Sequence, residues 1–118
     1  MAVALVGAGG VIGVLARYGI GRATAGTDAL IWSTVGINVV GSFLLGVLVA
    51  GAWFTNDTRE ALGVGVLGGF TTFSTFSVQF VLEAEGGRAG IAVVYVLASV
   101  LGGLAAAWAG YALGRTLT

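Results

Sequence analysis

The sequence contains no cysteine, histidine, lysine or proline, and only 8% of its 118 residues are charged. Without cysteine and histidine, the usual thiolate and imidazole ligands for zinc, copper or haem are missing. No carboxylate lies inside an apolar stretch either, so no nucleophile–base pair for covalent catalysis can be assembled. The composition therefore argues against an enzyme and against a transition-metal protein.

The scarcity of charge leaves long apolar runs. Hydrophobic residues make up 58% of the chain, and each uncharged run can hold the roughly 20 apolar residues that one membrane-spanning helix needs. The first run lacks a basic leading region and a cleavage site, so it does not resemble a signal peptide. We predict an all-α, multi-pass protein of the cell membrane. Its single transmembrane domain covers residues 1–118, with helices at about 3–23, 32–53, 62–82 and 90–114.

The third predicted span is interrupted by residues 71–75 (TTFST). From Ala61 to Leu82 no side chain is charged, yet the centre of this run holds two glycines and four hydroxyl residues between positions 68 and 75. In lipid, irregular backbone survives only inside protein or beside a water-filled cavity. We therefore predict that the third helix is broken at mid-span, and that the break marks an ion or substrate site.

Glycine is abundant, with 22 residues. Four helices make too small a bundle to enclose a pore, and small residues let helices associate closely in lipid. We therefore expect an oligomer, most simply a dimer. The pairs of small residues four apart are Gly9/Gly13, Gly65/Gly69, Gly102/Ala106 and Gly110/Gly114.

The arginines are divided almost evenly between the two sides of the membrane. With four spans, Arg59 and Arg115 lie on one side, and Arg17, Arg22 and Arg88 lie on the other. Orientation follows the Lys/Arg difference between sides, and this difference is nearly absent. The chain can therefore insert both ways and pair as an antiparallel, dual-topology dimer. The alternative is a single orientation set by other factors.

Polar residues inside the spans recur every four residues, which places them on one face of their helix. As an alternative to a polar pathway, such residues can join helices by hydrogen bonds. Convergence of these stripes with the TTFST interruption favours a shared pathway. The stripes are Thr34, Asn38 and Ser42 in the second helix, and Tyr95 and Ser99 in the fourth, where Gly103 follows.

The same residues limit what could travel along such a pathway. No Asp, Glu, Lys or His lies within a span, so proton coupling has no group to titrate, and acidic rings for cations are absent. Hydroxyls and an amide can donate hydrogen bonds, and the edge of a phenyl ring carries partial positive charge. These groups suit a small anion, although phenylalanines three residues apart, such as Phe73 and Phe76, are also common in plain packing.

Three segments closely resemble the Fluc (CrcB) family of fluoride channels. They are residues 68–77 (GGFTTFSTFS), 9–18 (GGVIGVLARY) and 37–46 (INVVGSFLLG), and the first is the most specific. The resemblance covers all four helices. It implies a dual-topology antiparallel homodimer in the cell membrane that exports fluoride passively, with a structural sodium ion where the two third helices cross.

The family pattern also implies roles for individual residues. Backbone carbonyls of Gly68 and Thr71 match the sodium ligands, and Arg17 matches the arginine of the first-helix motif. Some members have a further hydroxyl in the fourth helix where this chain has Gly103. The positions that match the fluoride pore are Arg17, Asn38, Phe73, Ser74, Thr75, Phe76, Tyr95 and Ser99.

Two other classes of function fit the sequence less well than a fluoride channel. Small dual-topology drug exporters have a similar length. Chains of that class have a membrane-embedded glutamate in the first helix, and this chain has none there. A non-transporting membrane subunit would not need a polar break. A fluoride channel built from two paralogous chains remains an alternative to the homodimer.

Overall fold

The computed structural model describes residues 1–117, and all of the regular structure in this range is helical. In chain order the elements are α1 (Ala2–Thr24), α2 (Ala29–Ala50), α3 (Asn56–Glu60), the π-helix η1 (Ala61–Leu67), α4 (Gly68–Phe70), α5 (Phe73–Glu85) and α6 (Ala89–Leu117). By length and composition, four stretches are long and apolar enough to cross a membrane: α1, α2, the series from α3 to α5, and α6.

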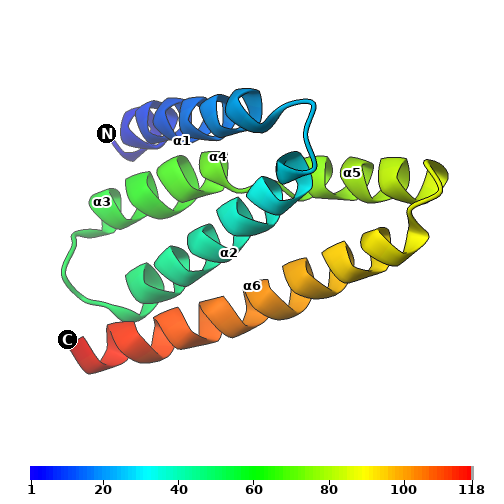
Figure 1. The fold of residues 1–118 in the computed structure, drawn as a ribbon. Helices are drawn as coiled ribbons and strands as arrows, with labels where there is room; N and C mark the ends of the chain where they lie inside the picture. The colour runs from blue at the N-terminus through cyan, green and yellow to red at the C-terminus, as the bar shows by residue number, and fades with distance from the viewer. Residues whose placement is uncertain (118) are drawn as a thin grey trace.

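The first span lies beside the third and the second beside the fourth, and the two helices of each pair run in the same direction. In Figure 1, α1 follows α3 and α4, whereas α2 follows α6, and both chain termini lie at the same end of the molecule. The shared direction is what four successive membrane crossings joined by short connections produce, because every second crossing runs the same way. Residues that are distant in sequence therefore meet along whole helices.

Glycines form the contact between α1 and the third span. A Cβ atom added at Gly13 would collide with the carbonyl oxygen of Val66, and one at Gly69 would lie 2.7 Å from the carbonyl oxygen of Gly10. Such close approach of backbones is what small residues allow in membrane helices. We expected these glycine pairs to join separate chains. They instead join helices within one chain, so they give no argument for a dimer.

A second glycine contact joins α2 and α6. A Cβ atom at Gly110 would collide with the carbonyl oxygen of Phe43, and one at Gly114 would lie 2.6 Å from that of Val47. The pair Gly110/Gly114, which we also expected at a subunit contact, is therefore used inside the chain. Because both glycine contacts run along parallel helices, the fold consists of two helix pairs placed beside each other.

The second helix begins and ends about three residues earlier than predicted. It ends at Ala50 because Gly51 turns to an extended conformation (φ −83°, ψ 154°). The ring of Trp53 then folds back onto Gly51, where any side chain would collide with it. Arg59 Nη2 donates a hydrogen bond of 2.8 Å to the carbonyl oxygen of Gly51 and so fixes this turn.

The third span is longer than the predicted 62–82, and a π-helix interrupts it after its first α-helical turns. Its first turn, α3, is capped by the side chain of Thr55, which accepts from the N–H of Thr58. The wider turns of η1 follow, with Gly63 and Gly65 buried. The composition of this stretch contains no signal that distinguishes a π-helix from an α-helix, so its sequence did not predict η1.

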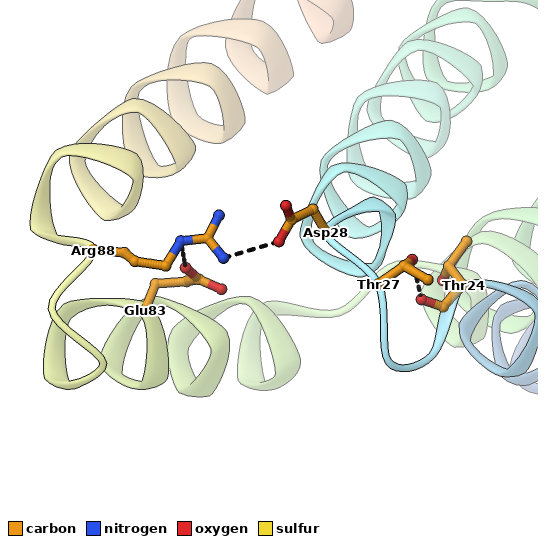
Figure 2. Close-up of polar contacts among 5 residues, drawn as sticks. All are labelled: Thr24, Thr27, Asp28, Glu83 and Arg88. Atoms are coloured by element: carbon orange, nitrogen blue, oxygen red, sulfur yellow. Dashed lines mark hydrogen bonds and ion pairs between the residues drawn. The ribbon is translucent and has the colours of Figure 1, made fainter.

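An ion-pair cluster joins the loops at the end opposite the termini. Figure 2 shows Arg88 between two carboxylates: Nη1 lies 2.8 Å from Asp28 Oδ1, and Nε lies 3.0 Å from Glu83 Oε2. The hydrogen bond to Asp28 raises the pKa of Arg88 above its usual value. The two turns at this end contain Gly26 and Gly87, which have φ of 77° and 82°, a conformation that favours glycine. Arg88 therefore ties the α1–α2 turn to the α5–α6 turn.

The buried core is small, and the molecule is flat. Its extents are 48 × 29 × 18 Å, and its length matches a bilayer with head groups, about 40–45 Å. The buried cluster contains Ile31, Phe76 and Tyr95, whereas many large apolar side chains are exposed along every span. Apolar surface of this extent suits lipid or a neighbouring protein rather than water.

The α1 contact leads to a stability prediction. Gly13→Ala should destabilise the protein by about 1–3 kcal/mol, because the added methyl group would have to push α1 away from the third span. Gly7→Ala is the matched control in the same helix, since a Cβ atom there meets nothing within 4 Å. Thermal unfolding in detergent would measure both variants, and equal stability of the two would contradict the packing described here.

Candidate functional site

Two extended residues separate α4 from α5. Thr71 (ψ 156°) and Thr72 (φ −152°, ψ 124°) both leave the helical conformation. The Thr72 side chain then caps α5 by accepting a 3.2 Å hydrogen bond from the N–H of Thr75, which is the role that N-cap hydroxyls play. The Thr71 hydroxyl donates back to the carbonyl oxygen of Leu67 at 2.9 Å.

The side chain of Asn38 in α2 holds this interruption in place. Its Nδ2 donates to the carbonyl oxygen of Thr72 at 3.0 Å, and its Oδ1 accepts from the N–H of Thr72 at 2.9 Å. The amide therefore satisfies both backbone groups of one extended residue. A free backbone group in lipid would be costly, so the bond geometry explains why an asparagine lies at this depth of α2.

The carbonyl groups of Gly68 and Thr71, the predicted sodium ligands, lose their ordinary helical donors. In a continuous helix the N–H of Thr72 would bond to Gly68 and the N–H of Thr75 to Thr71. Here the first of these N–H groups goes to Asn38 and the second to the Thr72 hydroxyl. Both oxygens are therefore available to another donor or to a cation, and oxygen ligands suit a hard cation.

Three aromatic rings stack edge to face beside the interruption. The centroids of Phe73 and Phe76 are 5.7 Å apart at 62°, and those of Phe76 and Tyr95 are 5.0 Å apart at 72°. Exposure falls along this row, from 78% for Phe73 to 8% for Phe76 and 0% for Tyr95. The buried Tyr95 ring packs against Phe76 and holds it in place, whereas the ring of Phe73 is exposed at the surface.

An open groove of about 430 Å³ runs between α2, the third span and α6. It brings together most of the residues predicted for the pore and for sodium, and of the described residues that line it none is acidic or basic. The predicted residues among its walls are Asn38, Gly68, Thr71, Phe73, Phe76 and Ser99.

A second cavity of about 230 Å³ shares Thr72 with the groove, and two further predicted pore residues, Arg17 and Thr75, line its walls. Arg17 Nε donates to the carbonyl oxygen of Gly69 at 3.1 Å, so its guanidinium reaches the interruption from α1. Thr72 lines both cavities. One of the two extended residues, Thr72, is therefore shared by a basic cavity and an uncharged groove.

Two predicted pore residues line neither cavity. Ser74 is exposed, and its hydroxyl lies 3.3 Å from that of Thr72. Tyr95 is fully buried behind Phe76 and donates from its hydroxyl to Gln79 Oε1 at 2.8 Å. In the single chain, Tyr95 therefore supports the Phe76 ring.

Sequence reasoning did not select two residues that matter for this geometry, Gln79 and Thr72. Gln79 is buried, lines the basic cavity and holds Tyr95. Polar stripes were identified in the second and fourth helices and at residues 71–75, so the amide of Gln79 further along the third span was overlooked. Its spacing was the available signal, since Thr72, Thr75 and Gln79 continue one polar face of α5 at intervals of three and four residues.

These features define the class of the molecule as a multi-pass helical membrane protein with a polar interruption in its third span. A family described as CrcB-like protein, Camphor Resistance (CrcB), matches residues 4–111, and the chain belongs to this family. Relatives include the fluoride-specific ion channel FluC of Agrobacterium fabrum, which is 46% identical over 122 aligned residues, covering 98% of this chain and 97% of the relative.

Two further relatives show similar agreement along the whole chain. The fluoride-specific ion channel FluC of Thermus thermophilus is 42% identical, with 96% of this chain and 94% of the relative covered. The fluoride-specific ion channel FluC 2 of Geobacillus kaustophilus is 44% identical, with 93% and 90% covered. The family consists of channels rather than enzymes, and this chain is a multi-pass protein of the cell membrane.

The Asn38 contact leads to a second prediction. Asn38→Leu keeps the size of the side chain but leaves the N–H and C=O of Thr72 unpaired, which should cost at least about 2 kcal/mol. The Thr72 amide proton should also exchange faster with solvent deuterium. Asn56→Leu is the control, because Asn56 is exposed at the start of α3. Unchanged exchange at Thr72 in the Asn38 variant would contradict the proposed support of the interruption.

Proposed function

We propose that the chain is a fluoride-selective channel that lets fluoride leave the cell passively and so protects the cell from fluoride toxicity. The observation that carries this proposal is the similarity, over nearly the full chain, to proteins named fluoride-specific ion channels. The alternative of a drug exporter lacks support, because no glutamate lies in α1.

The chemistry of the groove supports a small anion. Its described walls carry hydroxyls, one amide, ring edges and apolar groups, and they carry no carboxylate. Phe73 and Phe76 lie edge to face, and the positive edge of a phenyl ring can contact an anion. Arg17 lies in the neighbouring cavity, where a fixed positive charge raises the local concentration of anions.

The same walls support passive movement. Coupling to protons would need an ionisable group along the path, and the residues described in the groove include none. Fluoride would therefore move down its electrochemical gradient through hydroxyl and ring contacts, without a step that depends on protonation of the protein.

We further propose that two chains form an antiparallel homodimer with a sodium ion at its centre. Phe73 is 78% exposed beside an open groove, so a second copy could close the groove and cover the ring. The interruption falls near the middle of the third span. Two antiparallel chains crossing there would present four carbonyl oxygens, those of Gly68 and Thr71 from each copy, and backbone carbonyls are suitable ligands for a dehydrated monovalent cation.

The function leads to a direct prediction. Purified protein in liposomes with a fluoride gradient, clamped by a potassium ionophore, should release fluoride without an imposed pH gradient and should release little chloride. A fluoride electrode would measure the release. The reason is that the proposed path has donors for a small anion but no titrating group.

Phe76→Ile is the matched variant, since it keeps bulk and apolarity but removes the ring edge. Fluoride release should fall strongly while the protein still elutes as a folded species. Release from the unmodified protein only when a pH gradient is present would overturn the channel, and full release by the variant would return Phe76 to a packing role.

The proposed sodium site leads to a prediction about stability. Sodium at a hundred times its dissociation constant should stabilise the assembled dimer by about 2.7 kcal/mol, because it binds the dimer only. Thermal unfolding at constant ionic strength, with sodium exchanged for a large organic cation, would measure this shift. Thr71→Ser should leave it unchanged, because the ligand is a backbone atom.

Crystals soaked with a heavier monovalent cation provide the decisive observation. Anomalous density between the carbonyl groups of Gly68 and Thr71 of both copies is expected, and a dimer without density there would end the sodium proposal. A protein that stays monomeric in bilayers by single-molecule photobleaching would end the dimer proposal, and a requirement for a paralogous chain would replace the homodimer by a heterodimer.

A further inference from the structure

Hydroxyl groups in membrane helices can donate to a carbonyl group one turn back, and half of the serine and threonine hydroxyls described in this chain do so. Ser33 donates to Leu30 at 2.8 Å, Thr34 to Leu30 at 3.2 Å, and Ser77 to Phe73 at 2.9 Å. Among the serine and threonine side chains described, three hydroxyls have no hydrogen bond, and two of them, Ser42 and Ser99, line the same groove. The third, Thr75, lines the basic cavity.

Ser42 and Ser99 approach the groove from opposite walls. Ser42 lies in α2 one turn beyond Asn38, and Ser99 lies in α6 one turn before Gly103. Gly103 has no side chain to cover Ser42: a Cβ atom there would lie 3.7 Å from Ser42 Oγ. The gap at Gly103 therefore leaves the Ser42 hydroxyl open to the groove and leaves room for a small group beside it.

The other polar side chains of the groove are already engaged. The Asn38 amide is bound to the backbone of Thr72, and the Thr71 hydroxyl to Leu67. The Ser99 hydroxyl oxygen is buried without a partner, and an unsatisfied buried polar group is costly. Two free hydroxyls without a nearby carboxylate can donate to a small anion, and each then gains the partner that it lacks.

Resting on the proposed fluoride channel, we propose that Ser42 is a pore residue that contacts fluoride together with Ser99, one helical turn beyond Asn38. The hydroxyls on the two walls form one anion contact, and Ser42 provides the donor at the level where α6 has only Gly103. This places a specificity-determining group on α2, in addition to the predicted polar residues of α6.

The test removes the hydroxyl and then restores it from the opposite wall. Ser42→Ala should lower the rate of fluoride release from liposomes about tenfold, the scale of losing one hydrogen bond to a charged group. Adding Gly103→Ser to this variant should recover most of the rate, because the new hydroxyl would occupy the space facing position 42. Adding Gly103→Ala instead is the matched control, and it should not recover the rate.

The outcomes separate this inference from the proposed function. If the unmodified protein releases fluoride and Ser42→Ala releases it equally fast, the pore role of Ser42 is wrong while the channel stands. If both double variants recover the rate, a methyl group at position 103 suffices, so Ser42 acts through packing and the inference is wrong. If neither recovers it, a hydroxyl facing position 42 does not replace the one lost, and the inference is wrong as well. If the unmodified protein releases no fluoride, the proposed function fails and the inference fails with it. Should the alanine variant not assemble, Ser42→Cys gives the same test with nearly the same volume and a weak donor.

Discussion

The two hydrogen bonds between the Asn38 amide and the backbone of Thr72 are the interaction on which the rest of the site depends. A membrane offers no water to an extended residue, so its N–H and C=O must find partners inside the protein. Once Asn38 supplies both partners, the helix can stop at Phe70 and start again at Phe73. The direction of the two phenylalanine rings and the released carbonyl groups both follow from that restart.

The interruption also divides the polar residues into two environments. Thr72 forms part of the wall of both cavities, with Arg17 on one side and the uncharged hydroxyls on the other. Positive charge is thereby kept close to the proposed path without entering it. Such an arrangement can attract an anion and then bind it through weak donors, and weak binding is what rapid passage through a pore requires.

Much of this organisation could be predicted from local sequence. The four spans follow from the distribution of charge, and the position of the interruption follows from glycine and hydroxyl residues clustered around Thr71. Most of the predicted pore and sodium positions line one groove. What sequence reasoning missed depends on contacts between helices: the use of Gly13 and Gly110 inside the chain, and the bond from Tyr95 to Gln79. None of these contacts has a signature in one segment alone.

The two polar contacts made to the interruption from other helices have a consequence for how the chain is made. Asn38 precedes Thr72 by 34 residues, and Arg17, which contacts Gly69, precedes it by 52. A growing chain emerges from its N-terminus onward, so both partners reach the bilayer before the residues that need them. The third span can therefore enter lipid with partners for its irregular backbone already in place. The order of the helices in the gene is thus also a workable order of insertion.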